Sequence, residues 1–133
     1  MIHSSGLAII YQKKILLVHP TGTAWSGTFS IPKGEVDSNE TYLETAIRET
    51  FEEVGIDIED DWIDKTEYVI EYKNRRKTYK KLHWFKTNIS DISFSKIKYF
   101  LQLSEVDYAS FMNIDDAIER IFWRQKPILE ILL

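Results

Sequence analysis

The sequence predicts an α/β protein, a sandwich with a mixed β-sheet. Two observations lead to this prediction. Short runs rich in β-branched and aromatic residues occur both before and after residues 41–54, as expected for strands. Within residues 41–54, apolar side chains recur at intervals of three and four residues, the repeat of one buried helical face. Because strands flank an early helix and a second helical pattern closes the chain, a layered sandwich is expected.

The strands are expected at runs bounded by polar residues, glycine or proline. They are residues 7–11, 15–19, 28–31, 66–72, 78–87 and 97–103. The first two are expected to form a hairpin, and a basic turn at residues 73–77 is expected to join two others. A final helix is expected from about Ile114 to the C-terminus, with a kink at Pro127.

The early helix carries start and stop signals. Thr41 and Glu44 have the spacing of a capping box, in which each side chain accepts a hydrogen bond from the other residue's backbone N–H. Gly55 follows the last apolar residue of the repeat and can take the left-handed conformation that ends a helix. The sequence therefore predicts a helix of about four turns between these residues.

The composition limits the classes of function. With 133 residues, the chain is expected to form a single domain, residues 1–133. The formal net charge of -4 argues against a general nucleic-acid binder that depends on excess positive charge. The absence of cysteine excludes disulfides, thiolate catalysis and cysteine-ligated metals. Since neither a signal peptide nor a membrane span is indicated, we expect a cytoplasmic protein with no membrane partner.

Three carboxylates share the polar face of the predicted helix. Residues three and four positions apart are neighbours on a helix, so Glu49 is expected near both Glu52 and Glu53. Like charges at this distance repel unless a cation lies between them, and clustered hard oxygen ligands suit Mg²⁺. Arg48 lies four residues before Glu52 and can hold a glutamate in place. From the spacing alone, a solvated charged face with ordinary ion pairs is an equal alternative.

Residues 34–56 resemble the Nudix box. That motif has two glycines, an Arg-Glu pair and a Glu-Glu pair at fixed spacings, with a further glutamate and a final aliphatic residue. The matching residues are Gly34, Glu40, Arg48, Glu49, Glu52, Glu53, Gly55 and Ile56. Thr50 stands where the family prefers an aliphatic residue; we interpret it as a packing variation, because it lies on the predicted core face. A weaker similarity, to a Nudix branch that hydrolyses dinucleoside polyphosphates and related nucleotides, extends over His19-Pro20, the loop around Trp25 and residues 29–35.

The resemblance implies a Nudix-type α/β/α sandwich and a hydrolase that uses Mg²⁺, with Mn²⁺ as a substitute. The implied metal ligands are the side chains of Glu49, Glu52 and Glu53 and the backbone carbonyl of Gly34. Glu49 or Glu52 would activate the attacking water, although some family members take this base from a later loop. Arg48 would orient a glutamate, and Glu40 would support the junction between loop and helix.

Several residues are candidates to bind the substrate. Lys33 precedes the box glycine, where a cation can neutralise a phosphate; a solvated lysine is the alternative. Trp25, Tyr79, Trp84 and His83 are candidates to stack on a nucleobase, although most such aromatics belong to a core or its rim. His19 and His83 are each more often structural than metal-binding or proton-exchanging.

The substrate implied by the resemblance is a small nucleotide, with a dinucleoside polyphosphate such as diadenosine tetraphosphate as the leading candidate and a nucleoside triphosphate next. Nucleotide sugars and the 5′ triphosphate end of RNA are alternatives. An RNA end would depend on the basic turn, which includes Arg75 and Arg76, but charge that protects an edge hairpin from aggregation explains that turn as well. A module that binds nucleotide without catalysis is a further alternative, but its usual mark is the loss of box glutamates, and all are present here.

Overall fold

The computed structural model describes residues 1–73 and 76–133, so Asn74 and Arg75 of the predicted basic turn lie outside the described residues. The strands are β1 (Ile2–Tyr11), β2 (Lys14–Pro20), β3 (Lys33–Glu35), β4 (Ile63–Lys73), β5 (Tyr79–Asn88) and β6 (Val106–Met112). The helices are α1 (Tyr42–Val54), α2 (Asp91–Ser95) and α3 (Ile114–Arg120), with two 3₁₀ segments, η1 (Asp60–Trp62) and η2 (Trp123–Leu132). None of the helices in the described part of the chain is long and apolar enough to cross a membrane.

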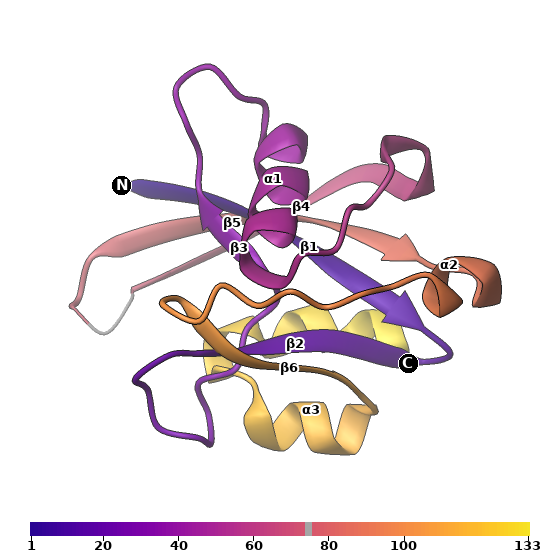
Figure 1. Ribbon diagram of the computed structural model, residues 1–133. Coiled ribbons are helices and arrows are strands. Elements are labelled where there is room, and N and C mark those ends of the chain that lie inside the picture. The colour runs from indigo at the N-terminus through magenta and orange to yellow at the C-terminus, as the bar shows by residue number, and fades with distance from the viewer. Residues whose placement is uncertain (74–75) are drawn as a thin grey trace.

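The sheet is mixed, as the sequence predicts. Its strand order is β4-β5-β1-β2-β6, and β3 pairs with β1 outside this path. β1 runs parallel to β5, whereas the other pairings are antiparallel. β1 pairs with β2 at its C-terminal end and with β3 near its N-terminal end. As Figure 1 shows, β2 and β6 therefore diverge from the other strands, and β3 lies beside α1 at the divergence.

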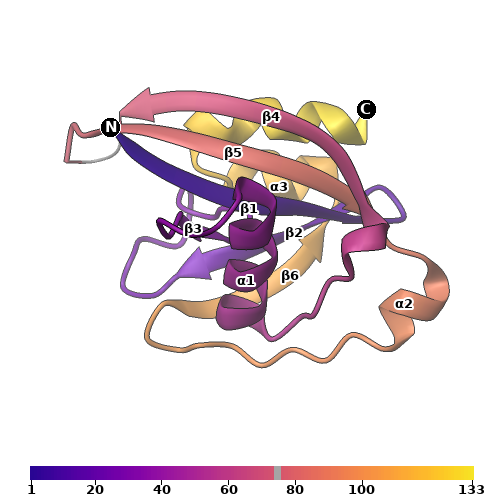
Figure 2. The same cartoon turned by 90° about the horizontal axis from the view of Figure 1, so that it is seen from above.

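Helical segments cover both faces of this sheet. Figure 2 shows α1 on one face and α3 with η2 on the other. The residues of β1 alternate between two hydrophobic clusters: Leu7 and Ile9 pack in the cluster under α1, and Ala8 and Ile10 pack in the cluster under α3 and η2. The predicted α/β/α sandwich is thus confirmed.

Both signals predicted for the early helix are present. The Thr41 side chain accepts a hydrogen bond from the Glu44 backbone N–H, and the Glu44 carboxylate accepts one from the Thr41 N–H, 3.0 Å away. Gly55 has a φ of 77°, which favours glycine. Thr50, which departs from the family pattern, is fully buried. Its hydroxyl donates to the Ala46 carbonyl at 2.8 Å, so the buried polar group has a hydrogen-bond partner within the helix.

The strand predicted at residues 97–103 is wrong. The Phe100 N–H donates to the Val54 carbonyl at 2.7 Å, and the Gln102 N–H donates to the Glu53 carbonyl at 3.0 Å. These carbonyls end helix α1 and have no partner within the helix, so the loop satisfies them and lies against the helix end. The strand that follows this loop is β6, which the sequence analysis missed.

The strand predicted at residues 28–31 and the single helix predicted from Ile114 onward also differ from the structure, and both differences have the same cause. Phe29 exchanges backbone hydrogen bonds with residues 120 and 122: its N–H donates to the Arg120 carbonyl, and its carbonyl accepts from the Phe122 N–H. Residues 28–31 therefore make only isolated bridges in the described structure, with Ser30 paired to Val18. Because residues 120–122 pair with Phe29, the predicted single closing helix is divided into α3 and η2.

Candidate active site

Helix α1 and strand β3 meet along the Nudix-box residues. The backbone N–H of Lys33 donates to Glu53 Oε1 at 3.0 Å, which ties the end of the helix to the strand. A Cβ atom built on Gly34 would lie 2.0 Å from the carboxyl carbon of Glu49. Only glycine leaves room for the Glu49 carboxylate at this position. The two glutamates are thereby held against the β3 backbone.

A third carboxylate joins them from a distant part of the chain. Glu49, Glu53 and Glu105 each offer one oxygen, and these oxygens lie within 4.8 Å of one another. Glu105 precedes β6, and its backbone carbonyl accepts a hydrogen bond from the Thr21 N–H at 2.9 Å. The sequence analysis did not identify Glu105, because a lone glutamate in a segment without a repeat gives no signal.

Glu52 lies outside this three-carboxylate cluster. Its side chain is half exposed and accepts a hydrogen bond from Arg48 Nη1 at 3.1 Å. The same nitrogen donates to Glu49 at 2.9 Å. Arg48 also binds both oxygens of Glu40, at 2.7 Å from Nε and 2.9 Å from Nη2. The side chains of Glu40 and Arg48 thus join the loop before α1 to the carboxylate-bearing helix face, where the resemblance places their roles.

The pKa of Glu40 shifts in the opposite direction to the pKa values of Glu49 and Glu53. Arg48 holds the pKa of Glu40 at about 2, well below its usual value. Burial raises the pKa of Glu53 to about 8, and although Lys33 opposes this rise, Glu49 and Glu105 add to it. Burial also raises the pKa of Glu49, despite the opposing charge of Arg48. Burial therefore disfavours the ionised forms of Glu49 and Glu53, and the neighbouring carboxylates add to this effect.

The convergence of these carboxylates fits a divalent cation. Three carboxylate oxygens converge in the space beside Gly34, and hard oxygen ligands are those that Mg²⁺ and Mn²⁺ prefer. A bound cation would stabilise the ionised form of Glu53, which burial disfavours. Glu49, Glu53 and Glu105 are thus the residues that fit a metal, with the Gly34 carbonyl expected beside them.

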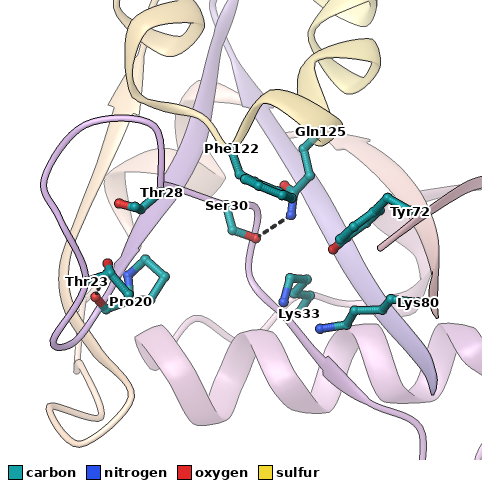
Figure 3. A pocket seen from close by; sticks show the side chains of 9 residues that line it. All are labelled: Pro20, Thr23, Thr28, Ser30, Lys33, Tyr72, Lys80, Phe122 and Gln125. Carbon is teal, nitrogen blue, oxygen red and sulfur yellow. Dashed lines mark hydrogen bonds between the residues drawn. The ribbon is translucent and has the colours of Figure 1, made fainter. Parts of the chain in front are cut away.

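A cavity of about 200 Å³ adjoins the cluster. Lys33 lines it, and the next residue, Gly34, contacts Glu49, so the cavity and the carboxylates are joined through β3. Figure 3 shows nine residues around it: Pro20, Thr23, Thr28, Ser30, Lys33, Tyr72, Lys80, Phe122 and Gln125. The buried Gln125 holds the wall together, because it accepts from the Ile31 N–H at 3.2 Å and donates to the Ser30 hydroxyl at 2.9 Å.

A comparison with protein families matches the model described as "NUDIX domain" to residues 1–131. The chain belongs to the NUDIX domain family. The family predicted from residues 34–56 is thus confirmed. A comparison with curated proteins found no match.

Solved structures of other NUDIX proteins share the fold. An Ap4A hydrolase from C. elegans, in a binary complex, is 21% identical with a TM-score of 0.75, and the match covers 98% of this chain and 93% of that chain. A MutT NUDIX hydrolase from Burkholderia pseudomallei is 20% identical with a TM-score of 0.77, covering 97% and 95%. The NUDIX domain of Shewanella oneidensis NrtR, complexed with ADP ribose, is 14% identical with a TM-score of 0.75, covering 98% and 84%.

Of the residues predicted to bind substrate, the structure of this NUDIX domain places only Lys33 at the cavity. Trp84 is a core residue, 4% exposed and stacked on Tyr68 at 4.4 Å between ring centroids, so it has no free face for a base. Tyr79 is exposed, with the Lys73 ammonium group over its ring. Trp25 belongs to the loop of residues 20–28, but its ring packs against Phe29 and Tyr108 and does not line the cavity.

His83 is buried in a stack with other rings. It lies 3.5 Å from Tyr42 between ring centroids, and its Nε2 lies 3.1 Å from His3 Nδ1. The aromatic residues that do line the cavity are Tyr72 and Phe122, which the sequence analysis missed. They come from β4 and from the break between α3 and η2, so no sequence repeat brings them together.

His19 ties the loop of residues 20–28 to β6. Its Nδ1 lies 2.5 Å from Asp107 Oδ1, and its Nε2 lies 3.0 Å from the Ala24 carbonyl oxygen. Both neighbours are acceptors, and the Thr23 hydroxyl also lies 3.2 Å from Nε2, so a protonated ring, with a donor on each nitrogen, suits this position. Burial lowers the pKa of His19, but the bonds to Asp107 and Ala24 raise it by more, and the net change is upward. We interpret His19 as a charged latch of a loop that lines the cavity.

We expect the latch to weaken as the pH rises. A raised pKa means that the bonds of His19 stabilise the fold fully below its usual pKa of 6.5 and lose this effect as the pH passes the raised value. In an Asp107→Asn variant, burial remains while the carboxylate is lost, so the pKa of His19 should fall below 6.5. An NMR titration of the ring measures both values, with exposed Asp115→Asn as the control. Equal pKa values in wild type and Asp107→Asn contradict the latch.

Proposed function

We propose that this NUDIX domain is a Mg²⁺-dependent hydrolase that cleaves a phosphoanhydride bond in a nucleoside polyphosphate. The observation that supports it most directly is the convergence of Glu49, Glu53 and Glu105 beside Gly34. Ionised carboxylates this close together repel one another unless a cation binds between them. Mg²⁺ commonly shares its coordination with substrate phosphates. Mn²⁺ has the same ligand preference and is expected to substitute.

The side chains of the site have different roles in this reaction. When bound, Mg²⁺ lowers the pKa of water and offsets the negative charge of phosphate. Glu53 holds the carboxylate cluster to β3 through the Lys33 N–H. Arg48 donates hydrogen bonds to Glu49 and Glu52 and so fixes the positions of both carboxylates. Glu105 is exposed, has no bond to Arg48 among the described residues and offers one oxygen to the cluster, so we assign the proton-accepting role to its other oxygen.

The cavity supports a nucleotide as the substrate. Tyr72 and Phe122 offer aromatic surface for a base or ribose, and Lys33 offers a positive charge for phosphate. Diadenosine tetraphosphate is the first substrate to test, because it combines adenosine groups with a phosphate chain and because a similar fold belongs to an Ap4A hydrolase. Nucleoside triphosphates, nucleotide sugars and triphosphorylated RNA ends complete the panel.

The test is metal-dependent turnover by the wild-type protein and a Glu105→Gln variant. We expect hydrolysis of diadenosine tetraphosphate with Mg²⁺ and none with a chelator. Loss of the general base in Glu105→Gln should reduce kcat by about 10²- to 10⁴-fold. Product identification in isotopically labelled water shows which phosphorus is attacked. A panel in which no phosphoanhydride is cleaved contradicts the proposed function, and a faster turnover of RNA ends than of all small nucleotides replaces the proposed substrate.

A further inference from the structure

Lys33 and Lys80 form a pair of positive charges in the cavity. Lys33 comes from β3 and Lys80 from β5, and Figure 3 shows their nitrogen atoms near one another at the same end of the cavity. In the part of the chain that the structure describes, neither ammonium group forms an ion pair with a carboxylate within 4.0 Å. Two adjacent like charges without a counter-ion destabilise each other.

The nearby acidic groups do not balance this pair. Burial and the charge of Lys33 together lower the pKa of Lys80 to about 8, although Glu35 and Glu53 act in the opposite direction. The position therefore favours an anion, which would interact with both ammonium groups at once.

The position of the pair indicates which part of a substrate would bind there. On one side, Gly34 follows Lys33 and contacts the carboxylate cluster through Glu49. On the other side lie the aromatic rings of Tyr72 and Phe122. A ligand that spans the site would place its phosphate chain between its metal-bound end and its nucleoside, and thus beside the two lysines.

We propose that Lys80 and Lys33 together clamp a diphosphate group, and that Lys80 thereby determines specificity for substrates with at least two linked phosphates. This inference rests on the proposed function and deepens it, because it assigns a residue outside the Nudix box to substrate choice. Lys81 provides the contrast: it points to the other face of the sheet and pairs with Glu71 at 3.3 Å, so it has a counter-ion and does not line the cavity.

The experiment measures binding of methylenediphosphonate, a pyrophosphate analogue with a bridge that cannot be hydrolysed, by calorimetry in the presence of Mg²⁺. Lys80→Met removes the charge but keeps a long side chain that tolerates burial. We expect its dissociation constant to be about 10- to 100-fold higher than that of wild type. The matched control, Lys81→Met, should change it by less than about twofold. Lys80→Arg keeps the charge and should bind more tightly than Lys80→Met.

Hydrolysis then separates the clamp from the chemistry. With the best substrate of the panel, Lys80→Met should raise KM and leave kcat close to the wild-type value, because the lysines hold the substrate rather than the reacting water. Equal binding of the analogue by wild type and Lys80→Met overturns the clamp, even if wild type hydrolyses nucleotides. Binding that depends on Lys80 in a protein without hydrolytic activity supports the clamp and contradicts only the proposed function.

Discussion

A Glu53→Gln variant is expected to lose activity by about 10³-fold or more in kcat, because loss of a metal-ligating carboxylate removes several kcal/mol of stabilisation from the transition state. Gln has the shape of Glu and keeps an oxygen to accept the Lys33 N–H, so the link between α1 and β3 should survive. The measurement is the Mg²⁺-dependent hydrolysis of the best substrate, with Mg²⁺ affinity by calorimetry. Glu130→Gln, an exposed position on η2, has the same charge change and should leave kcat unaltered.

The stability of the same variant tests the cause. The pKa of Glu53 is raised from 4.5 to about 8, so without metal the wild-type protein should lose stability as the pH rises through this interval. Gln does not ionise, and the variant should therefore unfold at a higher temperature than wild type above pH 8 in a chelator, with a difference that narrows toward pH 5. A variant that hydrolyses at the wild-type rate rules out Glu53 as a metal ligand.

The second large effect is expected from Gly34→Ala. The new methyl group would lie 2.0 Å from the carboxyl carbon of Glu49, and the side chain would have to move. We expect the metal affinity to fall and kcat to drop by about 10²-fold, since a small misplacement of catalytic groups has effects of this size. The atoms nearest the new methyl group belong to the end of the flexible Glu49 side chain, which can move away, so the fold should remain intact. Circular dichroism and thermal unfolding test this.

A double-mutant cycle isolates the cause of that loss. If Gly34→Ala acts by displacing the Glu49 carboxylate, it should have little further effect in a Glu49→Ala background. Losses that multiply in the double variant would show that the methyl group acts elsewhere, for example on the pairing of β3 with β1 at Ser5.

The helix at the centre of the site was predictable from sequence because its signals are local. A capping box, a glycine stop and a repeat of apolar residues act within a few positions of one another, so Thr41, Glu44 and Gly55 are where they were expected. The same is true of the helix-borne site residues, since Glu49 and Glu53 are neighbours on any α-helix. The Nudix box adds Gly34, whose contact with Glu49 explains why glycine stands there.

The errors occurred where backbone groups bond to partners far away in the chain. The N–H groups of the loop that precedes Glu105 donate to carbonyls at the end of α1, and residues 120–122 bond to Phe29 instead of continuing a helix. Neither arrangement leaves a repeat in the sequence. Trp84 was misplaced for a related reason, since an aromatic residue on a strand has the same local pattern whether it faces the core or a ligand.

The sequence by itself determined the helix, the strands of the hairpins, two of the clustered carboxylates and, through the box, the family. Only the tertiary structure decided that Glu105 completes the cluster, that Tyr72 and Phe122 line the cavity, and that Lys80 stands beside Lys33. The physical reason is the separation along the chain of the interacting residues. Capping and helical periodicity act between near neighbours in the chain, whereas a binding site is assembled from distant segments that sheet pairing and loop contacts bring together.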